Sequence, residues 1–121
     1  MKTILIVDDS QFALNSMERC MRKHYNVLTA RNGIEAIEIA KSKHPDLILM
    51  DVLMPKMHGL ECCSAIRDDP DIKHIPIMIV TSMSDPQTEI MALRAGARDY
   101  VKKPFDCEIL QLRIKNLLEP R

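Results

Sequence analysis

This sequence has few aromatic residues, few glycines and no net charge. Phenylalanine, tyrosine and tryptophan make up 3% of its 121 residues, and tryptophan is absent. The core must therefore be built from aliphatic side chains and from nine methionines, which fill irregular gaps. Because the formal net charge is zero, the composition gives no reason to expect direct binding to nucleic acid or to a membrane.

Long apolar runs and metal-type cysteine spacings are also absent. No apolar run approaches the roughly 20 residues that a membrane-spanning helix needs. No signal peptide is evident, because residues 1–3 lead directly into a short apolar run that ends in acids. The four cysteines, Cys20, Cys62, Cys63 and Cys107, lack the spacing of a metal site. We therefore expect a soluble cytoplasmic protein whose thiols are reduced.

Short apolar runs recur along the chain and are continuous rather than alternating with polar residues. Such runs are typical of strands that helices cover on both faces. The expected strands lie at residues 4–7, 27–30, 47–50 and 77–80, with a weaker one at 100–101.

Amphipathic stretches separate these runs and predict five helices. Ala13, Met17, Cys20 and Met21 share one face of the first helix, which Ser10 can cap. Three more helices are expected over 33–42, 59–67 and 86–95, and the last has a buried stripe of Leu110, Ile114, Leu117 and Leu118.

The alternation of five strands with five helices predicts the fold class. It indicates an α/β protein, a single doubly wound (βα)5 domain built from right-handed β-α-β units. We expect a five-stranded parallel sheet of order 2-1-3-4-5 with helices on both faces. The length suits one domain over residues 1–121, which either stands alone or forms the N-terminal part of a longer protein.

Polar residues that can carry chemistry fall where the apolar runs end. They are Asp8 and Asp9 after the first run, Asp51 after the third, Thr81 after the fourth and Lys103 after the fifth. In open α/β sheets, ligands bind outside the carboxyl ends of the strands. Each residue alone has a simpler explanation, such as a helix cap, a turn former or a solvated lysine. Their coincidence at one end of successive strands favours a shared site.

Three carboxylates in one crevice repel one another unless a cation lies among them. Oxygen ligands without a nearby histidine or cysteine favour Mg²⁺, although Mn²⁺ would also fit. Mg²⁺ takes only one or two carboxylates directly, so one acid is free to attack phosphorus and form an aspartyl-phosphate. The metal, a lysine ammonium and a hydroxyl would then stabilise the transferring oxygens.

Four motifs in chain order resemble the receiver domains of two-component response regulators. They are IVDDS, DVLMPKMHGLE, VTS and DYVKKPF, and the resemblance covers essentially the whole chain. It implies a flavodoxin-like fold similar to that of chemotaxis regulators. Asp9 matches the direct Mg²⁺ ligand, and Asp8 matches the acid that binds the metal through water. Asp51 matches the phosphorylated aspartate, which also ligates the metal, and Leu53 offers a backbone carbonyl as a further ligand.

The resemblance also assigns the switch residues. Thr81 matches the hydroxyl that moves toward the phosphoryl group, and Tyr100 matches the aromatic whose rotamer reports the active state. Lys103 matches the family's lysine because it directly precedes Pro104, whereas strand alternation points Lys102 the other way. The Lys103–Pro104 bond should be cis, as in that family.

The function implied is that of a phosphorylation-activated signalling receiver, not a turnover enzyme. Asp51 would take its phosphoryl group from the phosphohistidine of a sensor histidine kinase or of a histidine phosphotransfer protein. Phosphorylation would change the surface of the fourth helix, fifth strand and fifth helix, through which a homodimer could form. The charged residues expected on or near this face are Glu89, Arg94, Arg98, Asp99, Lys102 and Arg113.

Two other functions stay open. The chain could be a phosphorelay intermediate that passes its phosphoryl group onward. It could instead be a flavodoxin-like phosphatase or nucleotide-binding enzyme. The nucleotide-binding alternative calls for a glycine-rich loop after the first strand, where this chain has Asp8, Asp9 and Ser10. The phosphatase alternative calls for a second acid two residues after Asp51, where this chain has Leu53.

Three positions depart from the family pattern. His58 stands where many relatives carry an acid or asparagine. Leu53 and Met83 flank the path of the water that would hydrolyse the phosphoryl group. Both are apolar and cannot orient that water by hydrogen bonding.

We therefore expect slow self-dephosphorylation. The double variant Leu53→Asn with Met83→Glu should lose its phosphoryl group severalfold faster, because polar groups would then position the water. The decay rate of the phosphorylated domain measures this. An unchanged rate would show that these positions do not control hydrolysis.

Overall fold

The computed structural model describes residues 1–54 and 57–119, and its centre is one parallel sheet. The strand order is β2-β1-β3-β4-β5, as the sequence predicts, and all four neighbouring pairs are parallel. Each predicted run lies within an observed strand. The strands are β1 (Thr3–Val7), β2 (Asn26–Ala30), β3 (Leu47–Met50), β4 (Ile77–Thr81) and β5 (Asp99–Lys102).

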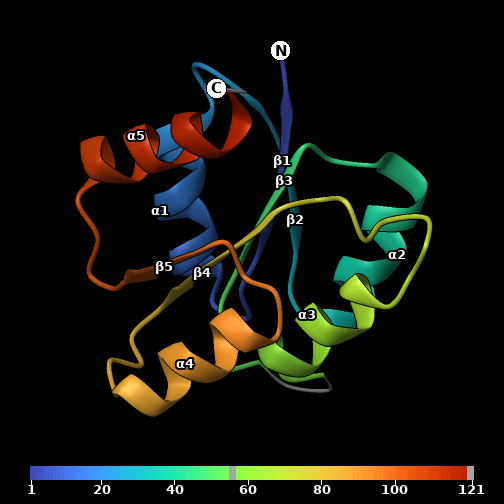
Figure 1. The fold of residues 1–121 in the computed structure, drawn as a ribbon. Helices are drawn as coiled ribbons and strands as arrows, with labels where there is room; N and C mark the ends of the chain where they lie inside the picture. The colour runs from blue at the N-terminus through green and yellow to red at the C-terminus, as the bar shows by residue number, and fades with distance from the viewer. Residues whose placement is uncertain (55–56, 120–121) are drawn as a thin grey trace.

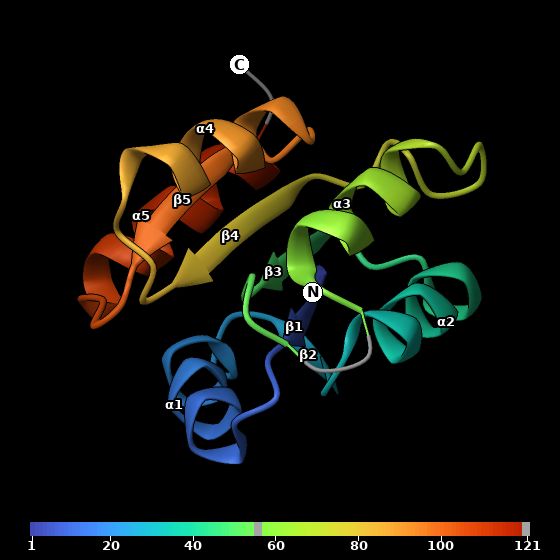
Figure 2. The same ribbon diagram turned by 90° about the horizontal axis from the view of Figure 1, so that it is seen from below.

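Helices cover both faces of the sheet, which confirms the predicted fold class. The pair α1 and α5 packs on one face, and α2, α3 and α4 pack on the other (Figures 1 and 2). None of the helices in the described part of the chain has the length and apolar character of a membrane span. The helices are α1 (Gln11–Met21), α2 (Gly33–Lys43), α3 (Gly59–Arg67), α4 (Pro86–Arg94) and α5 (Cys107–Leu118).

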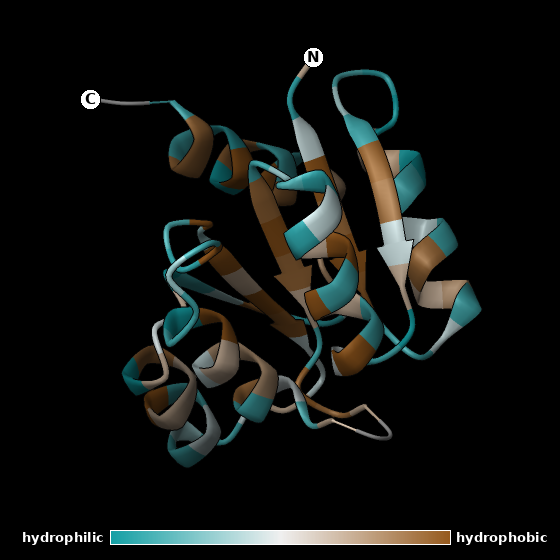
Figure 3. Ribbon diagram, turned by 90° about the vertical axis from the view of Figure 1, so that its right-hand side faces the viewer, coloured by the Kyte–Doolittle hydropathy of each residue, from teal (hydrophilic) through white to brown (hydrophobic). Residues whose placement is uncertain are grey.

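The strands are buried because side chains on both of their faces enter a core. In β1, Ile4 and Ile6 pack with α1 and α5, whereas Leu5 and Val7 pack with the other three helices. Figure 3 shows the continuous apolar strands inside a shell of mixed helices. Aliphatic and methionine side chains fill both cores, as the composition predicts, while Phe12 is 78% exposed.

Each helix begins at a polar capping residue, and in α3 this residue is a histidine. The side chains of Ser10, Asn32, Asp85 and Asp106 each accept a backbone N–H of the first turn. His58 does the same for α3, where its Nδ1 accepts the N–H of Leu60 at 3.2 Å. The histidine that departs from the family pattern therefore serves as a helix cap.

The expectation of reduced thiols is wrong for two of the four cysteines. Cys20 on α1 and Cys107 at the start of α5 form a disulfide, and their Cα atoms are 5.7 Å apart. The sequence spacing could not reveal this pair, because only the packing of α1 against α5 brings positions 87 apart together. Cys62 and Cys63 are free and buried.

Gly59 lets the start of α3 lie directly against the backbone that follows β3. A Cβ at this position would be 2.2 Å from the Asp51 carbonyl oxygen and 2.6 Å from the Val52 Cα. The Gly59 N–H donates to the Val52 carbonyl at 3.0 Å. Any larger residue must therefore displace the backbone that carries Asp51.

Gly59→Ala should lower the free energy of unfolding by about 2 to 4 kcal/mol, because the added methyl group overlaps backbone atoms that cannot turn aside. Urea denaturation measures the loss. Gly33→Ala is the comparison, since its methyl group would lie 2.8 Å from Met57 Cβ and Cγ and 3.0 Å from the Met57 carbonyl oxygen, a milder overlap than at Gly59. Equal losses in the two variants would contradict this interpretation.

Candidate functional site

Lys103 joins two acids that follow different strands. Its Nζ donates to Asp8 Oδ2 at 2.5 Å and to Asp51 Oδ2 at 3.1 Å. Asp8 follows β1, Asp51 follows the neighbouring β3, and Lys103 follows β5, so its side chain crosses the end of β4. The carboxyl edge of the sheet thus brings together three residues that lie up to 95 positions apart in sequence.

Backbone amides hold both carboxylates in place. The Ser10 N–H donates to Asp8 Oδ1 at 3.0 Å, and the Leu53 N–H donates to Asp51 Oδ1 at 3.2 Å. Each acid therefore has one oxygen bound by an amide and the other bound by Lys103. The arrangement fixes the direction in which the Asp51 carboxylate faces.

Burial and ion pairing act in opposite directions on these groups. Asp8 is 1% exposed, and burial raises the pKa of its carboxyl despite the hydrogen bonds from Lys103 and Ser10. Burial by itself would lower the pKa of the Lys103 ammonium. Its hydrogen bonds to Asp8 and Asp51 outweigh burial and hold the pKa above the usual value. The ammonium therefore stays charged between the two acids.

The chemistry of this donor set fits Mg²⁺, although the predicted third acid is not gathered with the other two. Mg²⁺ binds one or two carboxylates and completes its shell with waters and phosphate oxygens. Asp8 and Asp51 supply two such carboxylates. Within residues 1–54 and 57–119, however, no three His, Cys, Asp or Glu side chains form a metal-binding group. Asp9 is exposed, and its backbone carbonyl accepts from Arg31 at 2.9 Å.

Thr81 and Tyr100 are linked through the peptide groups of Met83. The Met83 N–H donates to the buried Thr81 Oγ1 at 3.3 Å, and the Tyr100 hydroxyl donates to the Met83 carbonyl at 2.6 Å. The Lys103 N–H donates to the Thr81 carbonyl at 2.8 Å. The threonine is thus connected both to the lysine and to the tyrosine. Sequence reasoning considered only the side chain of Met83 and missed this role of its backbone.

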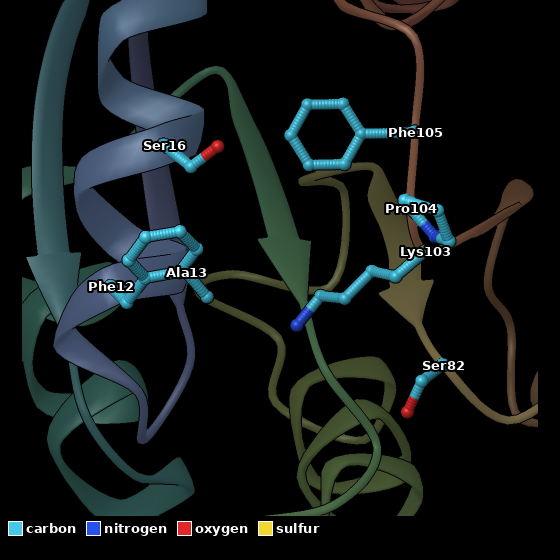
Figure 4. A pocket seen from close by; sticks show the side chains of 7 residues that line it. All are labelled: Phe12, Ala13, Ser16, Ser82, Lys103, Pro104 and Phe105. Carbon is cyan, nitrogen blue, oxygen red and sulfur yellow. The ribbon is translucent and has the colours of Figure 1, made fainter.

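The side chains of Lys102 and Lys103 lie in different surroundings. Lys102 is exposed, whereas Lys103 enters the site, and the Lys103–Pro104 peptide bond is cis. The ammonium of Lys103 points into a groove of about 340 Å³ between α1 and the segment after β5 (Figure 4). The groove is mainly apolar and is lined by Phe12, Ala13, Ser16, Ser82, Lys103, Pro104 and Phe105.

The chain is similar in sequence to known proteins. The sequence matches the family model of the response regulator receiver domain over residues 4–115. Over 119 residues it is 41% identical to histidine kinase P4 of Formosa agariphila. This match covers 98% of this chain and 9% of that protein. Over 119 residues it is also 36% identical to protein PilH of Pseudomonas aeruginosa, and this match covers 98% of each protein.

A solved structure shows the same fold. The receiver domain of a sensor histidine kinase from Pseudomonas aeruginosa PAO1, with a magnesium ion coordinated in its active site cleft, superposes with a TM-score of 0.90. The two are 29% identical, and the match covers 97% of each chain. The chain spans between 9% and 26% of the length of the first curated relatives that it matches. The family model covers most of the sequence, so this chain belongs to the response regulator receiver domains, the signalling modules of two-component systems.

Proposed function

We propose that this receiver is switched when Asp51 takes a phosphoryl group from a phosphohistidine. The donor would be a sensor histidine kinase or a histidine phosphotransfer protein. The observation that carries the proposal is the double contact of Lys103 with Asp8 and Asp51. It places a cation beside one oxygen of an aspartate whose other oxygen an amide holds.

In the proposed reaction, a carboxylate oxygen of Asp51 bonds to phosphorus while the bond between phosphorus and the donor imidazole nitrogen breaks. The imidazole leaves with the electron pair and takes up a proton. Lys103 would move from the carboxylate to a phosphoryl oxygen and offset the charge of roughly −1.5 to −2 that arrives. Asp8, buried and negative, would keep the ammonium close to that position.

A divalent metal is part of the proposal. Asp8, Asp9, Asp51 and the backbone carbonyl of Leu53 would hold Mg²⁺, and Mn²⁺ would also fit. Such an ion neutralises charge on the transferring oxygens. Asp9 directly follows Asp8 in the chain and its side chain is exposed, so in this proposal it turns to join the pair when the metal binds.

The groove beside Lys103 suits the approach of a donor protein. A phosphohistidine must reach Asp51 across the surface that surrounds it. Phe12 and Phe105 line the groove, and Phe12 is 78% exposed although it is a large apolar side chain. Exposed apolar surface next to a reactive group is typical of a docking site. We therefore propose that the donor contacts this groove while it delivers the phosphoryl group.

The proposed switch runs through Thr81, Met83 and Tyr100. If the Thr81 hydroxyl turns toward a phosphoryl oxygen, Met83 N–H loses its acceptor. The same residue accepts from the Tyr100 hydroxyl, so the tyrosine on β5 is affected as well. Phosphorylation would thereby favour a second arrangement of the loop before α4 and of the Tyr100 ring.

The output face proposed for this switch comprises α4, β5 and α5. Glu89, Arg94, Arg98 and Lys102 are exposed there. Asp99 and Arg113 already pair within the domain, at 3.0 Å and 3.1 Å, so they would have to exchange partners to bridge two copies. A homodimer through this face stays a prediction.

We also infer that the chain is not a turnover enzyme, because it would accept and slowly release its own phosphoryl group. Leu53 is 49% exposed and apolar, and it offers no side-chain group to activate water. A long-lived phosphoryl group suits a persistent switch, and it suits a phosphorelay intermediate equally well. The cytoplasmic location stays a prediction.

Phosphorylation should require both Asp51 and a divalent metal. Incubated with a small acyl phosphate and Mg²⁺, the protein should gain one phosphoryl group by intact mass, and Asp51→Asn should gain none. Asp68→Asn is the matched control, since Asp68 is exposed at the far end of α3. Undiminished labelling in excess chelator, or labelling of Asp51→Asn, would refute the proposal.

Lys103→Met should raise the pKa of the Asp8 carboxyl further. Burial raises that pKa, whereas the hydrogen bond and charge of Lys103 lower it, and without Lys103 only the hydrogen bond from the Ser10 N–H would still oppose burial. Nuclear magnetic resonance of the carboxyl carbon should therefore show Asp8 titrating at higher pH than in the unmodified protein. Lys102→Met is the control, because Lys102 is exposed at the end of β5, one residue before Lys103. Identical Asp8 titrations in the two variants would rule out the electrostatic role of Lys103.

A further inference from the structure

Two cysteines connect helices that both lead away from the acid site. Cys20 lies in the last turn of α1, the helix that follows Asp8, and Cys107 is the first residue of α5, the helix that follows Lys103. Their disulfide spans Cα atoms 5.7 Å apart, a separation typical of such bonds. Both residues are partly exposed, so reagents in solution can reach them.

Non-covalent contacts already hold the two cysteines together. The Gln111 amide on α5 donates to the Cys20 carbonyl, and its nitrogen lies 3.8 Å from Cys107 Sγ. Met17 on α1 and Leu110 on α5 belong to the same buried core. These contacts do not depend on the sulfur–sulfur bond. The two thiols of the reduced protein therefore stay close and can be oxidised without rearrangement of the fold.

The cysteine pair follows closely in the chain after residues that line the two walls of the groove shown in Figure 4. Ser16, which lines the α1 wall, is one helical turn before Cys20. Phe105, which lines the opposite wall, is two residues before Cys107. A covalent bond between Cys20 and Cys107 therefore restricts how far α1 can move from the start of α5, and with them the two walls of the groove.

We propose that Cys20 and Cys107 are a redox modification site, at which a reversible disulfide ties α1 to α5 and stiffens the groove between them. The oxidant class is a low-molecular-weight disulfide. The thiolate of one cysteine attacks it, forms a mixed disulfide and releases one small thiol. The second cysteine then attacks the mixed disulfide and releases the other small thiol. Two protein thiols are oxidised, one small disulfide is reduced to two thiols, and excess small thiol reverses the reaction.

The other two cysteines provide an internal comparison. Cys62 and Cys63 are buried on the opposite face of the sheet, among the residues that pack with α2, α3 and α4. Burial raises the pKa of the Cys62 thiol to about 12, so the reactive thiolate is scarce. Oxidation should therefore select Cys20 and Cys107.

The chemical test uses the unmodified protein, first fully reduced and then treated with oxidised glutathione. The treated protein should lose two hydrogen atoms by intact mass. After denaturation, an alkylating reagent should label only Cys62 and Cys63, and addition of dithiothreitol should restore all four thiols. Four labelled thiols in the treated protein, or a bond that involves Cys62 or Cys63, would overturn the proposal.

The structural test compares the oxidised and reduced forms of the same protein. Oxidation should slow amide hydrogen exchange in the last turn of α1 and the first turn of α5, with α2 unchanged. It should also raise the urea midpoint by roughly 1 to 2 M, since the bond closes a long loop. Cys20→Ser should match the reduced protein under both conditions. Equal amide exchange and equal urea midpoints in the two forms would refute the proposal that the disulfide stiffens this part of the fold.

This proposal does not rest on phosphorylation of Asp51. No hydrogen bond within the described residues joins either cysteine side chain to Asp8, Asp51 or Lys103. Mass and exchange measurements detect the disulfide without any phosphoryl donor. Failure of Asp51 to accept a phosphoryl group would therefore be seen separately from failure of the disulfide to form.

Discussion

The contact of one ammonium with two carboxylates is the constraint on which the site depends. Without Lys103, the buried Asp8 and the neighbouring Asp51 would face each other with no compensating charge. The parallel sheet makes the contact possible, because the carboxyl ends of its strands share one edge. Helix α1 contributes as well, since it begins just after Asp8 and Asp9 at a capped N-terminus whose dipole favours negative charge nearby.

Much of the architecture could be predicted because the relevant signals are local. Continuous apolar runs identify strands buried on both faces, and helical periodicity with polar caps identifies the helices between them. Leu47–Met50 and Gly59–Arg67 were predicted to the residue. The weakest run, at 100–101, proved to be the middle of β5, whose Asp99, Tyr100 and Lys102 are only partly buried or exposed.

The features that sequence reasoning missed depend on three-dimensional packing. The Cys20–Cys107 bond and the Asp99–Arg113 pair require α5 to lie against α1 and β5. The backbone link through Met83 has no side-chain signature at all. The position of Asp9 depends on side-chain rotation, which the motif does not encode. These are contacts between elements, whereas the sequence patterns describe single elements.

Lys103, which completes the site, follows the last strand in chain order, β5. Its acidic partner Asp8 follows the first, β1. A chain emerging from the ribosome exposes Asp8 and Asp51 long before Lys103 is synthesised. Such an unfinished chain has the proposed acceptor, Asp51, but lacks the cation that contacts it in the folded domain. Nascent or truncated copies would therefore not accept a phosphoryl group from a donor, and only a domain with the complete sheet would be phosphorylated. If the proposal holds, the reach of the Lys103 side chain across the sheet would restrict phosphorylation to fully folded copies of the domain.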